Sequence, residues 1–282
     1  MKTIFIAGAG TMGLDIARVF AQNGMDVIVR DISEPIIDSA RKKLDAALDK
    51  QVAGGRITAE NAANVRSRIR CTVDTIPAAE ADLVLEAILE RADLKIALFQ
   101  ELDRLCRPDC IFCSNTSSIS ITQMAAASGR PDRFLGMHFF NPADKMKLIE
   151  LTRSLTTSDE TFQTVRELAL EIGKEPVEVQ DSPGFVVNRL LIPMMNEAAF
   201  LLSEGTASAE DIDKAMRLGA NHPMGPLHLA DLVGLDVLLH ACDVLYEETH
   251  DPKFRACYLL RKMVRAGMLG RKSGRGFFTY EN

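Results

Sequence analysis

Short apolar runs alternate with helical periodicity over the first 180 or so residues of the chain. Residues 2–7 form an apolar run that ends at a glycine, and residues 27–29 form another. Between them, residues 11–23 carry apolar side chains at helical spacing and stop at Gly24, where a helix end favours glycine. The pattern predicts a strand, a turn, a helix and a second strand, which is typical of a βαβ unit.

The same alternation continues along the chain. Helical periodicity covers residues 35–52, with a proline at its start and two glycines after its end. Further strand-like runs cover residues 83–87, 110–114, 134–140 and 148–151, and residues 177–179 are read as one more edge strand. Alternation of this kind predicts an α/β fold, with a largely parallel sheet and helices on both faces.

The pattern changes at Asp181-Ser182-Pro183-Gly184. Beyond it only helical patterns are found, over residues 185–204, 208–218, 234–249 and 254–266. The first of these is apolar on nearly every side, so we expect it to be buried all round. We therefore expect an N-terminal Rossmann-type dinucleotide-binding domain over residues 1–182, followed by an all-α C-terminal domain over residues 183–282.

Composition narrows the classes of function. Apolar residues make up 47% of the 282 positions, which is enough for a core, and the net charge of −6 argues against a nucleic-acid partner. Residues 184–202 are the most apolar long stretch, but polar side chains interrupt them, so no membrane span is expected. The N-terminus runs directly into an apolar strand without a signal-peptide pattern, which favours a cytoplasmic protein.

The six cysteines indicate packed thiols in a reducing compartment. Cys110 and Cys113 have C-x-x-C spacing, but they lie in a strand-like run, where residues three apart face opposite sides. No second C-x-x-C and no nearby histidine completes a zinc site, so no metal is expected.

A glycine-rich segment follows the first strand and opens the first helix. It reads Gly8-Ala9-Gly10-Thr11-Met12-Gly13, the G-x-G-x-x-G spacing of dinucleotide-binding turns. Gly8 would permit the tight turn, Gly10 the approach of the pyrophosphate, and Gly13 close packing of helix on strand. The amides at the start of the helix would bind the phosphates.

Asp31 follows the second strand, where a carboxylate accepts hydrogen bonds from the adenosine ribose hydroxyls. A carboxylate there repels a 2′-phosphate, so the sequence favours NAD over NADP. Arg30 keeps the alternative open, because its guanidinium would bind that phosphate if it turned toward it.

His138 lies at the end of a strand-like run, just before Asn141-Pro142. It is either a core histidine or a general base, and the second reading is favoured because α/β sheets bind ligands at the carboxyl ends of their strands. A general base needs an orienting partner, and Glu150 is the candidate. The alternative for Glu150 is a solvated charge at a strand edge.

Two further polar features flank this region. Ser114-Asn115-Thr116-Ser117-Ser118 follows another strand and would line a nicotinamide and substrate site. The alternative is a helix N-cap at Ser118 or Ser120, and the two roles are compatible. Asn188 lies one turn into the apolar helix of residues 185–204. As a buried amide it would need partners, either within the protein or in a cleft.

Taken together, these segments resemble the L-3-hydroxyacyl-CoA dehydrogenases, most closely the short bacterial 3-hydroxybutyryl-CoA dehydrogenases. The matching runs span nearly the whole chain in order: Gly8–Gly13, Ser114–Ser118, His138–Pro142, Asp181–Arg189, Met224–Leu227 and Gly274–Phe278.

The resemblance implies a role for particular residues. The catalytic dyad falls on His138 and Glu150, and the substrate contacts fall on Ser117 and Asn188. The family's NAD contacts fall on Asp31, Glu90, Lys95 and Asn115, with Gly8, Gly10, Thr11, Met12 and Gly13 in the glycine-rich turn. The resemblance also implies a helical C-terminal domain that forms a homodimer.

One region departs from the family. Close bacterial relatives carry several lysines after the long helix, where the phosphates of CoA bind. Here Lys50 and Arg56 remain as candidate CoA contacts, but Gly54 replaces one expected lysine.

The sequence therefore predicts an NAD-dependent enzyme that interconverts L-3-hydroxyacyl-CoA and 3-oxoacyl-CoA. Its physiological direction, fatty-acid breakdown or synthesis of short acids, stays open. Two alternatives also stay open: a dehydrogenase of a free hydroxy acid or sugar acid, and a nucleotide-binding protein without catalysis.

Overall fold

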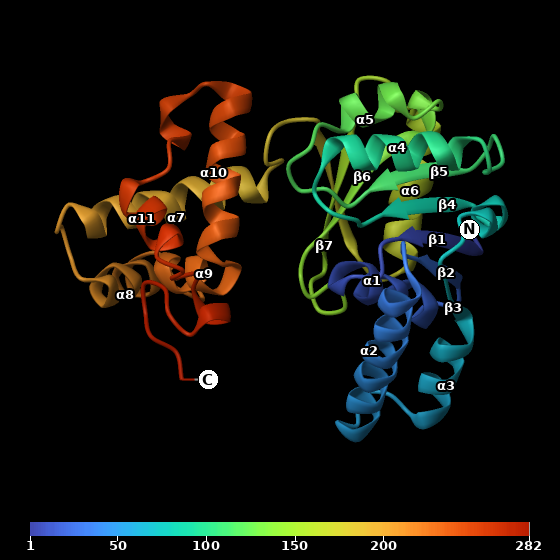
Figure 1. The fold of residues 1–282 in the computed structure, drawn as a ribbon, viewed down its shortest axis with the longest axis horizontal. Helices are drawn as coiled ribbons and strands as arrows, with labels where there is room; N and C mark the ends of the chain where they lie inside the picture. Colours follow the sequence, from blue (N-terminus) through green and yellow to red (C-terminus); the bar gives the residue numbers. More distant parts are fainter. Residues whose placement is uncertain (282) are drawn as a thin grey trace. The chain divides into compact units, whose positions relative to one another are not determined.

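The computed structural model describes residues 1–281, and these form two compact units. The first is Met1–Ser182, and the second begins at Pro183. The first unit is built around a sheet, and the second consists of helices and short turns (Figure 1). The expected fold class, a Rossmann-type α/β domain followed by an all-α domain, is confirmed.

One eight-stranded sheet forms the centre of the first unit, in the order β3-β2-β1-β4-β5-β6-β7-β8. The strands are β1 (Thr3–Ala7), β2 (Asp26–Arg30), β3 (Ile69–Thr72), β4 (Leu83–Glu86), β5 (Ile111–Ser114), β6 (Phe134–Phe139), β7 (Leu148–Arg153) and β8 (Glu175–Gln180). All neighbours pair in parallel except β6 and β7, which are antiparallel. The first six strands have the order of dinucleotide-binding sheets, with a switch point between β1 and β4.

Helices cover both faces of this sheet (Figure 1). They are α1 (Thr11–Gln22), α2 (Glu34–Ala53), α3 (Ala59–Arg68), α4 (Ala92–Asp103), α5 (Ile121–Ala127) and α6 (Asp159–Glu171), with 3-10 turns η1 (Ile76–Glu80) and η2 (Pro131–Arg133). One apolar core packs α1, α2, α3 and α6 against alternate strand positions. On the other face, Phe99 of α4 packs against Phe112 and Phe134, with ring centroids 5.4 and 4.7 Å apart.

Strand β3 and helix α3 have no counterpart in the sequence-based prediction. Strand β3 lies at the edge of the sheet and has no fully buried residue. Only two of its four side chains, Ile69 and Cys71, are apolar, so it lacks the continuous apolar run that marks the central strands. Helix α3 buries only Ala62 and Val65, which is too short an apolar stripe to recognise.

In its described residues, the second unit consists of helices joined by loops, with two isolated antiparallel bridges, Gly270 with Arg275 and Arg275 with Thr279. Its helices are α7 (Val187–Ser203), α8 (Ala209–Gly219), α9 (Pro226–Val233), α10 (Leu235–Thr249) and α11 (Tyr258–Arg265), with 3-10 turns η3 (Pro252–Phe254) and η4 (Arg271–Ser273). The predicted helices match α7, α8 and α10 to within two residues. Helix α9, of eight residues, was not predicted, and the helix expected to start at residue 254 starts at Tyr258 after a separate turn.

The expectation that the first of these helices is buried all round is wrong. Helix α7 buries one face, through residues such as Ile192, Met195 and Ala199. On the other side Leu190 is 68% exposed. A long apolar stretch therefore does not always find cover within its own chain.

A buried amide fixes the inner face of α7. Asn196 is buried, its side-chain oxygen accepts a hydrogen bond from the amide of Cys257, and its nitrogen donates one to the carbonyl of Arg255. Both backbone groups precede α11, so this side chain joins the start of that helix to α7.

All six cysteines are free thiols, and five of them are buried. Burial raises the pKa of the Cys113 thiol, as expected for a sulfur packed among apolar side chains. Among residues 1–281, no cluster of His, Cys, Asp and Glu is arranged to hold a metal ion. Within the same residues, no helix has the length and hydropathy needed to cross a membrane.

Candidate active site

The glycine-rich turn lies at the switch point between β1 and β4. Gly8 has a φ of +112°, and a Cβ built on it would lie 2.4 Å from the carbonyl oxygen of Ala87. A Cβ on Gly13 would lie 1.9 Å from the carbonyl oxygen of Gly8. Both glycines are therefore needed by the protein itself, the first for the turn after β1 and the second for close packing of α1.

Gly10 differs from the other two, because a Cβ added to it would meet no protein atom within 4 Å, in a backbone conformation that alanine also adopts. It stands at the N-cap of α1, no side chain caps that helix, and its first turn has no acidic residue. The start of α1 thus offers uncapped amides and open space, which suits a phosphate-bearing ligand.

Asp31 lies directly beyond β2, beside this turn. One of its carboxylate oxygens accepts a hydrogen bond from the amide of Ala9, at 2.7 Å, and the other accepts one from the amide of Ile32. The carboxylate is thereby held next to the glycine-rich segment. The neighbouring Arg30 donates from Nε to the carbonyl of Val73, so in this structure it is tied to the end of β3.

A buried network of charges occupies the other side of the switch point. Glu86, the last residue of β4, is fully buried, and its carboxylate accepts from the Lys95 ammonium at 2.6 Å, the Ser114 hydroxyl at 2.6 Å and the Ile88 amide at 2.7 Å. Burial raises the pKa of the Glu86 carboxyl, and these three donors oppose that effect. Lys95 reaches this carboxylate from the first turn of α4.

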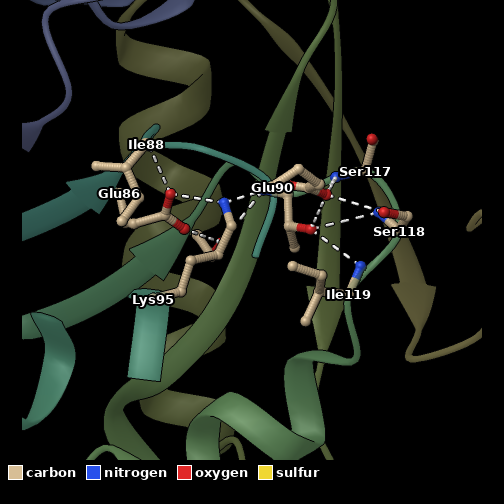
Figure 2. Close-up of polar contacts among 9 residues, drawn as sticks. Glu86, Ile88, Glu90, Lys95, Ser117, Ser118 and Ile119 are labelled. Carbon is tan, nitrogen blue, oxygen red and sulfur yellow. Dashed lines mark hydrogen bonds and ion pairs between the residues drawn. The ribbon is translucent and has the colours of Figure 1, made fainter. Parts of the chain in front are cut away.

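The Lys95 ammonium also contacts a second carboxylate, that of Glu90, at 3.0 Å (Figure 2). Glu90 accepts from the hydroxyls of Thr116 and Ser118 and from the amide of Ser117, at 3.1 Å. Although burial alone would raise the pKa of Glu90, the Lys95 ammonium and these hydroxyls hold it below its usual range. One carboxylate therefore fixes the whole loop after β5.

This loop presents the predicted site residues Asn115 and Ser117. The side-chain oxygen of Asn115 accepts from the amide of Phe139 at 2.8 Å, which ties the loop to the end of β6. The backbone of Ser117 is held by Glu90, and in Figure 2 its hydroxyl points away from that carboxylate. The predicted helix cap is also present, because the Ser120 hydroxyl caps α5.

The predicted dyad is assembled by the antiparallel pairing of β6 and β7. His138 and Glu150 are direct partners in the strand register, and His138 Nδ1 lies 2.8 Å from a carboxylate oxygen of Glu150. His138 is 6% exposed and Glu150 is 1% exposed. Glu150 is therefore a buried hydrogen-bond partner of the imidazole, and the alternative of a solvated edge charge is wrong.

A lysine that the sequence analysis did not single out holds the loop after His138. The ammonium of Lys174, which is buried, donates to the carbonyls of Ala143 at 2.6 Å and Met146 at 2.7 Å. Burial lowers the pKa of Lys174. Lysines are rarely buried, but nothing in the local sequence distinguishes this one from an exposed lysine near a helix end.

Lys95 is 1% exposed and ion-paired with both Glu86 and Glu90. Its ammonium therefore supports these two carboxylates, and its direct contact to NAD stays a prediction.

Asn188 belongs to the second unit, on α7. The sequence predicted a buried amide, but in the structure this side chain is half-buried. Lys50 and Arg56 lie at and just after the end of α2, and both are exposed. Glu86 was not singled out, although a carboxylate that ends a buried apolar strand is a recognisable signal.

Two family models cover almost the whole chain. The NAD-binding domain of 3-hydroxyacyl-CoA dehydrogenase matches residues 3–182, and the C-terminal domain of the same enzyme matches residues 184–280. The chain belongs to the 3-hydroxyacyl-CoA dehydrogenase family. It is accordingly an NAD-dependent oxidoreductase, as the sequence predicted.

Relatives within the 3-hydroxyacyl-CoA dehydrogenase family match over their full length. A probable 3-hydroxybutyryl-CoA dehydrogenase of Bacillus subtilis is 47% identical over 281 residues, covering 100% of this chain and 98% of that one. The 3-hydroxybutyryl-CoA dehydrogenase of Clostridioides difficile is 48% identical, covering 98% of both chains. The crystal structure of an (S)-3-hydroxybutyryl-CoA dehydrogenase from Ralstonia eutropha is 46% identical, covers 100% of both chains and has a TM-score of 0.96.

The residues of this dehydrogenase fit NAD at the switch point. The space at Gly10 and the uncapped start of α1 suit a pyrophosphate, and Asp31 lies where a ribose hydroxyl would donate to it.

The two glycines of the turn give a matched test of this reading. Replacing Gly13 by alanine should lower the free energy of unfolding by about 1–3 kcal/mol or more, because its Cβ would overlap the Gly8 carbonyl. Replacing Gly10 by alanine should leave that free energy within about 0.5 kcal/mol of the original value, because the Cβ meets no protein atom.

The Gly10 variant should nevertheless bind NADH about tenfold more weakly or worse, because its methyl group would fill the space needed by the pyrophosphate. Urea denaturation and titration of NADH fluorescence measure the two effects. Unchanged NADH affinity in Gly10→Ala would contradict the assignment of this space to the cofactor.

Proposed function

We propose that this member of the family acts on short-chain substrates and interconverts L-3-hydroxybutyryl-CoA and acetoacetyl-CoA with NAD. The observation that carries the proposal is the buried pair of His138 and Glu150 at the carboxyl end of β6. The names of the relatives, which are 3-hydroxybutyryl-CoA dehydrogenases over their full length, support the short acyl chain.

The dyad moves the proton of the reaction. With Nδ1 protonated toward Glu150, Nε2 of His138 carries the lone pair that takes the substrate hydroxyl proton during oxidation. In reduction the same nitrogen returns the proton to the developing alkoxide. Glu150 keeps the ring in this tautomer and stabilises the imidazolium that forms.

Bound NAD supplies the hydride acceptor for C3 of the substrate. We assign Ser117 to a hydrogen bond with the reacting oxygen, because Glu90 fixes its backbone and its hydroxyl points away from that carboxylate (Figure 2). Asn188 is assigned to the same substrate from α7 by resemblance to the family. Groups that hold the oxygen in a near-attack geometry raise the rate by restricting unproductive motion.

We place the protein in the cytoplasm, because its six thiols are free.

The proposed function is tested by NADH oxidation with acetoacetyl-CoA beside free acetoacetate. We expect turnover with the thioester and little with the free acid. Turnover of free acetoacetate alone would point to a dehydrogenase of free acids. NADH binding without turnover of either compound would point to a nucleotide-binding protein without catalysis.

Substitutions in the dyad test the assigned roles. His138→Ala should lose about 10²–10⁴-fold in kcat, the usual contribution of general acid–base catalysis, while its Kd for NADH stays close to the original value. Glu150→Gln keeps the shape of the side chain but removes its charge, and it should also slow turnover strongly. Near-normal kcat in either variant would return that residue to a purely structural role.

Two cations at the end of α2 are proposed to bind the phosphates of CoA. Lys50 and Arg56 are exposed there. The nearest carboxylates along the helix, Asp45 and Asp49, are both engaged by Arg66, at 2.5 and 3.3 Å. Remote binding energy of this kind can be used to position the reacting end of a substrate. The alternative is that the two cations only offset the helix dipole.

Alanine at Lys50 or at Arg56 should raise KM for acetoacetyl-CoA several-fold and leave KM for NADH unchanged. The effect should shrink at high salt, since exposed charges are screened over about 10 Å at 0.1 M. A truncated thioester without the nucleotide should not respond. Arg104→Ala is the matched control, because Arg104 is an exposed cation at the end of another helix, α4. There it can only offset the helix dipole, so this substitution should leave KM for acetoacetyl-CoA unchanged.

We also propose a homodimer formed through the helical unit. Its support is the apolar surface that the chain leaves uncovered, including Leu190, Val237 and Tyr258. Large apolar side chains that gather on one surface are typical of interaction sites. The family resemblance adds that the C-terminal domains form the contact.

Sedimentation velocity at micromolar concentration should give about twice the mass of the 31.0 kDa chain. Leu190→Lys should shift the protein toward monomer, because a charge would then have to be buried at the contact. A wild-type protein that sediments as a monomer would contradict the proposal.

A further inference from the structure

Three charged side chains meet beside the switch point with an unequal balance of signs. Glu86 and Glu90 each carry a carboxylate, and Lys95 is the one ammonium that both of them contact, at 2.6 and 3.0 Å. Glu86 and Lys95 are almost completely buried, whereas the Glu90 side chain is 32% exposed. With all three side chains ionised, the cluster carries one net negative charge. This charge lies toward Glu90, the partly exposed member of the cluster.

Hydrogen-bond donors hold the charge in place. Glu86 accepts from the Ser114 hydroxyl and the Ile88 amide as well as from Lys95, and Glu90 accepts from two hydroxyls and an amide of the loop after β5 (Figure 2). Donors of this kind favour the ionised form of a carboxyl. Because these bonds are made within the protein, the carboxylates are already oriented before any ligand binds.

The place of this cluster relative to the cofactor follows from the sheet and rests on the proposed function. Asp31 lies beyond β2, and Gly10 lies beyond β1. A dinucleotide with its adenosine ribose at Asp31 and its pyrophosphate at α1 therefore extends its other half toward β4 and β5. Glu86 ends β4, and the loop that Glu90 holds follows β5, so the cluster lies on the nicotinamide side.

We propose that Glu86 sets the preference of the site between oxidised and reduced cofactor. The nicotinamide ring is positively charged when oxidised and becomes neutral when it accepts a hydride. A fixed net negative charge stabilises the first form and not the second. Glu86 supplies the carboxylate that keeps the cluster negative, because without it Lys95 and Glu90 form a neutral pair.

This charge also affects the balance of species on the enzyme. Stabilising the oxidised cofactor shifts the bound equilibrium toward the hydroxyacyl substrate, that is, toward reduction of the ketone. The equilibrium constant of the reaction in solution is unchanged, because an enzyme changes only the relative stability of the species bound to it. Glu86 itself touches neither cofactor nor substrate in this reading, and it acts through Lys95 and Glu90 as a positioning residue.

Glu86→Gln tests the proposal by binding measurements alone. NADH is titrated by its own fluorescence and NAD⁺ by calorimetry, both in the same buffer and at the same pH. A unit charge at about 10 Å in a medium of effective dielectric about 20–40 changes a Kd by about four- to twentyfold. We expect the ratio Kd(NAD⁺)/Kd(NADH) to rise by that factor, chiefly through weaker NAD⁺ binding.

A matched control removes the same charge elsewhere. Glu80 lies before the amino end of the same strand, β4, and pairs with Arg70 on the surface, so Glu80→Gln should leave the ratio unchanged. Should Glu86→Gln not fold, Glu90→Gln removes one charge from the same cluster and is expected to raise the ratio as well.

The outcomes separate this inference from the proposed function. A purely structural role for Glu86 would weaken both cofactors equally, and that result, or an unchanged ratio, would overturn the inference. Failure of the wild type to bind either cofactor would overturn the proposed function and the inference with it. Wild-type binding and turnover with an unchanged ratio in Glu86→Gln would leave the proposed function standing alone.

Discussion

Parallel pairing of β1 with both β2 and β4 is the constraint on which the rest of the site depends. It brings the carboxyl ends of three strands to one edge of the sheet. From β1 the strand order runs outward in both directions, to β2 and β3 on one side and to β4, β5 and β6 on the other. Gly8 and the backbone after Glu86 then approach so closely that no Cβ fits between them. The cofactor turn, the ribose-side carboxylate and the charge cluster all follow from this one junction.

The proton-transfer pair depends on a different pairing in the same sheet. The β6–β7 contact is the single antiparallel one, and it sets His138 directly opposite Glu150 on a buried face. Side chains of directly opposite residues in neighbouring strands lie close enough to form a hydrogen bond, so the strand pairing alone brings the two groups together. The long turn between the two strands is held separately by the Lys174 ammonium, so the dyad and the loop beside it have independent supports.

The sequence predicted the features that local pattern determines. Apolar runs gave the central strands, and the spacing of glycines gave the turn after β1. What it could not give were contacts that depend on how distant elements come together. Lys95 reads as an ordinary lysine in the first turn of a helix, and only the approach of α4 to β4 makes it a buried partner of Glu86.

The error about the burial of α7 and the two missed elements, β3 and α9, have different causes. Residues 187–203 are apolar on most sides, but apolarity does not say whether a face is covered by its own chain, and Leu190 is left exposed. Strand β3 and helix α9 were missed for the opposite reason, since an edge strand and an eight-residue helix bury too little apolar surface to show a period.

Stability alone does not explain the cluster of Glu86, Lys95 and Glu90. Burying an ion pair costs desolvation energy that the attraction between the charges only partly recovers, and well-packed apolar side chains of the same volume often serve the fold equally well. Removing one partner from an isolated buried pair costs about 3–5 kcal/mol, because the other charge is left unpaired. Here the loss of Glu86 would still leave Lys95 paired with Glu90. This chain keeps two carboxylates, those of Glu86 and Glu90, around the single ammonium of Lys95, near the edge where β4 and β5 end. The excess negative charge supplies a fixed electrostatic field at that edge rather than additional stability of the core.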